Sequence, residues 1–216
     1  MTLQNRVDPL GAIHDNPARG LFTGNRGVIH DPATKTLLSR RWTTKAWIIC
    51  ECEWKGRHRE AMGRNGRQGG AGWTELFFLD EPTALAAGHR PCFACRRERA
   101  TLFLELFGES FGIREPKAAD LDSRLHGQRA VSSNRVETLD RAALAELPDG
   151  AVLFDGHDCF ALKGGQALPW SFEGYAEPRP TDAVAPGEDR VGVVTPAATL
   201  AVLRAGYRPV WHPSAA

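Results

Sequence analysis

The stretch Gly88-His89-Arg90-Pro91-Cys92-Phe93-Ala94-Cys95-Arg96-Arg97 places two cysteines three positions apart in a short turn between arginines. A Cys-x-x-Cys turn is typical of half of a structural zinc site, and tetrahedral zinc needs two more thiolate or imidazole ligands. The upstream pair Cys50 and Cys52 is the first choice for them, with His30 as an alternative fourth ligand and His89 as a further nitrogen donor. We therefore expect a structural Zn²⁺ held by Cys50, Cys52, Cys92 and Cys95.

The upstream pair lies in a segment, residues 45–55, whose alternation of side chains predicts a strand. Cys50 and Cys52 then share one face. Residues two apart on a strand lie roughly 6.5 to 7 Å apart, so both sulfurs reach one ion only where a bulge or strand end draws them together. The two cysteines are thus alternatives nearly as readily as partners, and one of them fits ordinary buried packing.

Length and composition are those of a globular protein: 216 residues, 42% hydrophobic and 25% charged. The start has no apolar signal core, and the apolar runs are too short to span a bilayer, so we expect a cytoplasmic protein without a membrane partner. In a reducing compartment, an odd count of five cysteines favours metal binding and free thiols, which leaves Cys159 as the spare.

The net charge of +1 hides an asymmetry along the chain. Residues 1–100 carry 16 basic and 10 acidic side chains, a balance of +6, whereas residues 101–216 have a balance of −5. A basic half that also contains the candidate metal site favours contact with phosphates. Attraction between the two halves explains the same asymmetry, and both interpretations stay open.

Hydrophobic periodicity and turn residues predict an α+β fold. It comprises a small, zinc-stabilised, basic, β-rich N-terminal half, residues 1–112, packed with an acidic α+β half, residues 113–216. The expected strands are 27–32, 36–42, 45–55, 73–79, 151–154, 159–162, 168–172 and 190–194, and the expected helices are 82–87, 96–111, 117–128, 139–147 and 196–206.

One local pattern occurs twice. Residues 203–209 (Leu-Arg-Ala-Gly-Tyr-Arg-Pro) match residues 85–91 (Leu-Ala-Ala-Gly-His-Arg-Pro) at five of seven positions, and each follows a predicted strand and a helix that begins at a proline. We interpret this as a strand–helix–glycine unit used twice. The second copy has Val210 and Trp211 in place of the first cysteine and the phenylalanine, so it lacks the metal-binding turn.

Several features indicate binding to nucleic acid, DNA or RNA, or to another phosphate-bearing ligand. The glycine-rich segment 63–72 predicts a flexible basic loop, and arginine suits bidentate contact with phosphate. Trp42, Trp54 or Trp73 is expected to stack on bases. Two alternatives explain the same features without nucleic acid: the glycine-rich segment is a long hairpin connection, and the arginines form a cationic ring that balances the charge of the thiolates. The candidate phosphate contacts are Arg57, Arg59, Arg64, Arg67, Arg90, Arg96, Arg97 and Arg99.

A second constellation suggests an enzyme. Asp122, His126 and Arg129 are spaced four and three apart, so they share one face of the predicted helix 117–128. A carboxylate that orients an imidazole beside an anion-holding arginine is an acid–base arrangement, and zinc would then be purely structural. Weak ion pairs on a solvated helix face give the same spacing.

The run from Phe77 to Cys95 resembles the second half of the zinc module of Ada-type DNA methyl-phosphotriester repair proteins. In that family a strand and a short helix lead to Gly-aromatic-Arg-Pro-Cys-x-x-Cys, which places Cys92 and Cys95 on the downstream ligand pair. The resemblance implies a four-thiolate zinc and an upstream cysteine that accepts a methyl group from DNA. The family spaces its upstream cysteines as Cys-x-x-x-Cys, whereas this chain has Cys50-x-Cys52. A thiolate methyl acceptor is therefore the second alternative to nucleic-acid binding, after the enzyme.

Overall fold

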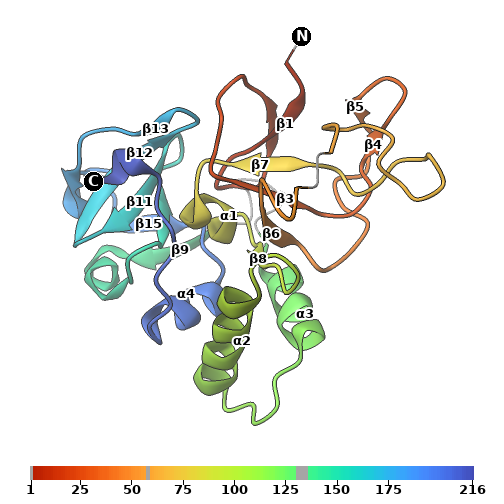
Figure 1. Cartoon of the computed structure of the whole chain (residues 1–216). Coiled ribbons are helices and arrows are strands. Elements are labelled where there is room, and N and C mark those ends of the chain that lie inside the picture. The colour runs from red at the N-terminus through yellow and green to blue at the C-terminus, as the bar shows by residue number, and fades with distance from the viewer. Residues whose placement is uncertain (1, 57–58, 130–135) are drawn as a thin grey trace.

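The computed structural model describes residues 2–56, 59–129 and 136–216 and has a mixed α+β architecture (Figure 1). The first of its two main sheets has the strand order β2-β1-β7-β3-β6-β8. A separate hairpin pairs β4 (His30–Asp31) with β5 (Thr36–Leu37), at the predicted position but with shorter strands. The strands of the first sheet are β1 (Gln4–Val7), β2 (Ile13–Asp15), β3 (Phe22–Asn25), β6 (Ile48–Glu51), β7 (Leu76–Phe78) and β8 (Arg90–Pro91).

The second sheet follows the order β13-β12-β11-β10-β15-β9, and β14 pairs with β12. All its pairings are antiparallel. Its strands are β9 (Glu137–Asp140), β10 (Val152–Phe154), β11 (Cys159–Lys163), β12 (Gln166–Ser171), β13 (Gly174–Tyr175), β14 (Arg179–Pro180) and β15 (Arg190–Val193). The helix predicted over 139–147 is wrong in its first part. Residues 137–140 pair with β15 as an edge strand, and only Arg141–Glu146 coils, as a 3-10 helix.

The described residues also form four α-helices: α1 (Glu81–Ala86), α2 (Arg97–Phe111), α3 (Ala118–Gln128) and α4 (Ala197–Arg204). Figure 1 shows α2, α3 and α4 together at one end of the molecule, with α1 between the two sheets. Each helix falls within one residue of a predicted start, because its apolar stripe or its proline start is local information. Across the described ranges no helix is long and apolar enough to cross a membrane.

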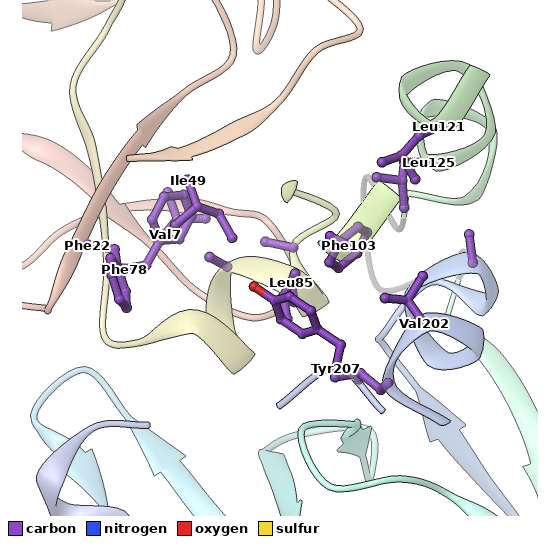
Figure 2. Packing of buried hydrophobic residues seen from close by; sticks show 14 of the residues in the cluster. Val7, Phe22, Ile49, Phe78, Leu85, Phe103, Leu121, Leu125, Val202 and Tyr207 are labelled. Atoms are coloured by element: carbon purple, nitrogen blue, oxygen red, sulfur yellow. The ribbon is translucent and has the colours of Figure 1, made fainter. Parts of the chain in front are cut away.

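The largest hydrophobic cluster joins elements from both ends of the chain. Phe22, Ile49 and Phe78 contribute one face of the first sheet, and Leu85 of α1 lies with Tyr207 near the middle of the cluster (Figure 2). The remaining members come chiefly from α2, α3 and α4. The core therefore crosses the predicted boundary between residues 112 and 113.

The two strand–helix–glycine units end in the same way. After α1 and after α4, the amide of a glycine with positive φ, Gly88 (+80°) or Gly206 (+116°), donates to the carbonyl three residues earlier, and the next amide donates to the carbonyl five residues earlier. A left-handed residue at this position satisfies the last carbonyls of a helix. The following residues, His89 and Tyr207, are both fully buried. The shared sequence pattern thus encodes a shared way of ending a helix against the core.

Asp80 and Glu81, at the start of α1, connect the first sheet to the C-terminal half. Asp80 caps the helix by accepting from the amide of Thr83 (3.0 Å), and its other oxygen accepts from the Tyr175 hydroxyl (2.9 Å) and from the amide of His212 (3.2 Å). Burial raises the pKa of Asp80, although each of these hydrogen bonds favours the ionised form.

Glu81 is completely buried and holds four donors from three segments. Its Oε1 accepts from Arg96 Nη1 (2.9 Å) and from the Tyr207 hydroxyl (2.6 Å). Its Oε2 accepts from Arg99 Nη2 (2.9 Å) and from the amide of Val210 (2.8 Å). A buried carboxylate is tolerated only with such complete pairing.

Replacing Glu81 tests how much its carboxylate contributes to the stability of the fold. We expect Glu81→Ala to lower the free energy of unfolding by about 3 kcal/mol, because buried Arg96 and the buried Tyr207 hydroxyl both lose their shared acceptor, although Arg96 keeps Glu51. Urea denaturation followed by circular dichroism measures the change. The matched control is Glu105→Ala on the exposed face of α2, expected to change stability by about 0.5 kcal/mol or less. Equal effects of the two substitutions would contradict a central role for Glu81.

Candidate metal centre and adjoining cleft

Three cysteines meet where β8 runs alongside β6. The two strands are parallel, with Ile49 opposite Pro91, and the amide of Cys92 donates to the carbonyl of Ile49 (2.9 Å). This register places Cys92 beside Cys50, and the turn brings Cys95 back to the same point. The sulfur atoms of the three cysteines all lie within 4.8 Å of one another. Three of the four cysteines predicted for one metal site, Cys50, Cys92 and Cys95, thus form a group that could hold an ion, and the fourth, Cys52, is not part of it.

Backbone amides of the turn donate to Cys92, one to its sulfur and one to its carbonyl. The amide of Ala94 donates to Cys92 Sγ (3.3 Å), and that of Arg96 donates to the Cys92 carbonyl (2.9 Å). Hydrogen bonds from the Cys50 and Cys95 thiols lower the pKa of Cys92 to about 2. The pKa of Cys50 is raised, chiefly by its hydrogen bonds to the other two sulfurs. A metal cation bound by these sulfurs would displace their protons, because the thiolate is the form that binds a metal.

The spacing of the cluster suits a thiophilic metal ion. Zinc–sulfur bonds of about 2.3 Å in a tetrahedron put sulfurs about 3.8 Å apart, so sulfurs within 4.8 Å need to move only slightly to bind one ion. Cys50 and Cys92 are buried and Cys95 is half-buried. Three protein ligands leave one coordination position for a fourth donor.

The other predicted ligands lie differently. Cys52 is exposed beyond the end of β6; its thiol donates to the carbonyl of Leu21 (3.5 Å), and its sulfur lies outside the group of three. His30 is buried with Nδ1 2.7 Å from Thr74 Oγ1 and Nε2 3.4 Å from the carbonyl of Gly63. The hairpin thus uses His30 as a structural residue, because its ring fastens the segment before β7.

His89 faces the core. Its Nε2 accepts from Arg26 Nε (3.3 Å), and its ring packs against Trp47 and Phe78 with centroids 5.1 and 4.7 Å apart. Trp47 has the guanidinium of Arg26 over its ring at 4.0 Å, and that of Arg129 at 4.1 Å. Burial, together with these two cations, lowers the pKa of His89 well below its usual value. The imidazole is therefore neutral and is enclosed by aromatic and cationic groups.

A cleft of about 660 Å³ opens beside the three sulfurs. The aromatic side chains of Trp54, Trp73 and Phe77 contribute to its wall. Its volume is that of a site for a small molecule. The remaining lining residues are Thr23, Asn25, Ile48, Cys50, Glu51, Cys52, Arg59, Asn65, Glu75, Cys92, Ala94 and Cys95.

Comparison with known proteins gives no relative. No family model matches the chain, and no curated protein or solved structure matches it. Function is therefore inferred from the chemistry of the described residues.

The arginines around the cysteine turn are engaged within the protein. Arg90 makes a two-pronged ion pair with Asp122, at 2.9 Å for both contacts, and both residues are buried. Arg96 is buried between Glu81 and Glu51, and Arg99 also binds Glu81. Arg97 is exposed. The charges of Arg90, Arg96 and Arg99 are thus neutralised by carboxylates, which removes the basis for their predicted contact with phosphates.

In the predicted basic loop and the residues just before it, one arginine is also paired with a carboxylate. Arg59 pairs with Glu75 (2.7 Å) and lies over the ring of Trp73, 4.1 Å from its centroid. Arg64 and Arg67 are exposed. Arg57 lies outside the described residues. This segment therefore holds two exposed cations, and one arginine that fastens it to β7 through Glu75.

The three residues of the predicted acid–base site make separate sets of contacts. Both oxygens of Asp122 are taken by Arg90, while His126 Nδ1 lies 3.2 Å from Arg129 Nη1. Arg129 also donates to the carbonyls of Gly88 (3.1 Å) and Lys45 (2.9 Å). Because the described hydrogen bonds pair Asp122 with Arg90 and not with His126, and none of the three lines the cleft, this geometry gives the enzyme hypothesis no support.

The loop 40–45 presents a surface that the sequence analysis found only in part, since it named Trp42 but not the cations beside it. Trp42 is 41% exposed, and its ring packs edge-on against His126 with centroids 4.7 Å apart. Arg40, Arg41 and Lys45 are exposed on the same loop, and none of them pairs with a carboxylate among the residues described. The run Arg-Arg-Trp-Thr-Thr-Lys, free of acidic residues, was the available signal.

The buried imidazole makes a prediction about pH. Because the folded state holds the pKa of His89 below its usual value, only the unfolded state takes up this proton as the pH falls below about 6.5. Stability is therefore lost toward acid, with a contribution from His89 of up to about 1.4 kcal/mol per pH unit. Urea denaturation at pH 7.5, 6.5 and 5.5 measures it. The comparison protein is His89→Gln, which keeps an acceptor for Arg26 and cannot titrate, and parallel pH profiles of the two proteins would refute the assignment.

Proposed function

We propose that the chain is a zinc-stabilised protein that binds nucleic acid through its N-terminal half. Cys50, Cys92 and Cys95 hold the Zn²⁺, and the loop 40–45 contacts the nucleic-acid strand. The observation that carries the proposal is an exposed tryptophan, Trp42, set among three cations that no described carboxylate neutralises. An exposed aromatic ring offers a stacking surface for a base, and the cations offer contacts for its phosphates.

The choice of zinc is supported by the donor set. Soft thiolates favour zinc over hard cations, and a Cys-x-x-Cys turn beside a strand cysteine is a usual way to build such a site. Bound there, the ion would join β6 to the turn that precedes α2, because Cys50 lies on β6 and Cys92 and Cys95 lie in the turn. Its role in this proposal is structural, consistent with the resemblance of residues 77–95 to the Ada-type zinc module.

The choice of the loop is supported by how its cations are anchored. Arg40 Nε donates to the carbonyl of Val28 (3.2 Å), and Arg41 Nη1 donates to the carbonyls of Leu38 and Ser39. Carbonyl partners orient a guanidinium but leave its positive charge in place, unlike the carboxylates that face Arg90 and Arg96. Burial lowers the pKa of nearby His126, and the charges of Arg129 and Lys45 lower it further.

Cysteine substitutions test the metal centre. Cys50→Ser, Cys92→Ser and Cys95→Ser are each expected to lose bound zinc and to lower the melting temperature, because structural metal binding contributes directly to folding. Zinc is measured by elemental analysis of protein dialysed against a weak chelator. Cys159→Ser, buried in the second half, is the control and should keep its zinc. Cys52→Ser is expected to keep its zinc as well. Full occupancy in Cys92→Ser would contradict the site.

Oligonucleotide titrations test the loop. We expect Trp42→Ala to weaken binding of a fluorescent single-stranded oligonucleotide by about 5-fold or more, since stacking on a base contributes about 1–3 kcal/mol. The double variant Arg40→Gln, Arg41→Gln should reduce the slope of log affinity against log salt by about 1.4, because each phosphate contact on a single strand contributes about 0.7. Fluorescence anisotropy measures both.

The matched cationic control is Arg97→Gln, an exposed arginine of the predicted surface near the cysteine turn. It should leave the salt slope unchanged. If Arg97→Gln reduced the slope of log affinity against log salt and the loop variant did not, the phosphate contacts would lie near the cysteine turn and not on the loop 40–45. Absence of salt-sensitive binding by the unsubstituted, zinc-loaded protein would overturn the proposal altogether.

A further inference from the structure

The first sheet presents two chemically different faces. Alternate residues of its three central strands, among them Phe22, Ile49 and Phe78, point into the hydrophobic core. The residues between them point the other way and line the cleft: Thr23 and Asn25 from β3, Ile48 and Cys50 from β6, and Phe77 from β7, with Trp73 and Glu75 just before it. A strand alternates its side chains between faces, so the cleft floor is the second face of these three strands.

The carboxylates of the cleft are already paired with arginines, one inside the cleft and one beside it. Glu75 accepts from Arg59 Nε (2.7 Å) and Asn65 Nδ2 (3.2 Å) through one oxygen, and from the amide of Met62 (2.9 Å) through the other. Glu51 lies 2.9 Å from Arg96. The contacts of Glu75 hold the segment 59–65 against the end of β7. Because both carboxylates are paired with arginines, they leave little charge for a ligand to neutralise. The occupant that suits them is uncharged in the part that enters.

Neutral hydrogen-bonding groups remain on the floor. The hydroxyl of buried Thr23 donates to the carbonyl of Leu76 (2.9 Å), so its oxygen is left to accept from a ligand. The carboxamide oxygen of buried Asn25 accepts from the amide of Gly27 (3.1 Å), and its NH₂ group has no partner among the described residues. Thr23 and Asn25 are two apart on β3, so an acceptor and a donor lie roughly 6.5 to 7 Å apart along the floor.

The aromatic walls accept flat groups. Trp54, Trp73 and Phe77 line the same space, and Trp73 already holds the planar guanidinium of Arg59 against its ring. The group that combines a flat aromatic surface, no net charge and both donors and acceptors at its edge is a nucleobase. Bases are recognised in proteins by stacking on aromatic and arginine planes, with hydrogen bonds at their edges.

We propose that the cleft beside the three cysteines is a binding site for one nucleobase, carried by a free nucleoside or by a single strand. The base lies among Trp54, Trp73 and Phe77, with its edge toward Thr23 and Asn25. This site lies apart from the loop 40–45, none of whose residues lines the cleft. It rests on the proposed zinc centre only because the thiolates form one wall.

The test uses the full-length, zinc-loaded protein and two probes. In one arm, adenosine, guanosine, cytidine and uridine are titrated by calorimetry. In the other, a single-stranded oligonucleotide is titrated by anisotropy. Trp73→Leu and Phe77→Leu remove an aromatic wall, and each is expected to weaken binding about 10-fold. Thr23→Val removes the acceptor while keeping the shape. Trp42→Leu, which changes an exposed tryptophan outside the cleft, is the control for the nucleoside arm. Zinc content and circular dichroism establish that each variant is folded.

Saturable nucleoside binding that falls in the cleft variants and is unchanged in Trp42→Leu supports the proposal with a free nucleoside as occupant. Oligonucleotide binding that falls in the cleft variants, with no nucleoside binding, supports it with a base of a strand as occupant. No binding in either arm, or binding that folded Phe77→Leu and Thr23→Val both leave unchanged, overturns it. The proposed function fails separately, if loop variants leave oligonucleotide binding unaltered while nucleosides still bind.

Discussion

The buried carboxylate of Glu81 connects the parts of this protein that carry its chemistry. It is the common acceptor for Arg96 at the end of the cysteine turn, Arg99 on α2, and Tyr207 and Val210 after α4. A carboxylate with no exposure must find donors for all its lone pairs, and these donors come from segments more than a hundred residues apart. The need to satisfy one buried charge therefore sets the position of the cysteine turn relative to the C-terminal half.

This arrangement changes the meaning of the basic N-terminal sequence. Arg90, Arg96 and Arg99 are neutralised inside the protein by Asp122, Glu51 and Glu81. Their role is to hold the turn against α1, β6 and α3 through ion pairs. Removing one partner of a buried ion pair is strongly destabilising, because it leaves the other charge buried and unpaired. A surface for phosphates is then best sought where cations lack acidic partners, and the loop 40–45 with Trp42 satisfies that condition.

The first sheet separates the hydrophobic core from the proposed binding site, because the two lie on opposite faces of it. One face buries Phe22, Ile49 and Phe78, and the other face carries Thr23, Asn25 and Cys50 into the cleft. The glycine at position 24 makes the core face possible, because a Cβ there would lie 2.1 Å from the carbonyl oxygen of Ile48 on the neighbouring strand. The parallel pairing of β6 with β8 then adds Cys92 and Cys95 at the end of the cleft floor.

Sequence alone determined the elements whose signals are local. The apolar stripe of α2, the proline and glycine limits of α1 and α4, and the pairing of Cys92 with Cys95 depend on residues a few positions apart. It also favoured an upstream cysteine as a third ligand but left Cys50 and Cys52 undecided, since strand alternation treats them alike. Only the tertiary structure decided for Cys50, because the register of β6 against β8 is non-local. For the same reason the three strands β1, β2 and β3, the ion pair between Arg90 and Asp122, and the cleft itself were not predicted. Each depends on contacts between segments that come together only when the chain is folded.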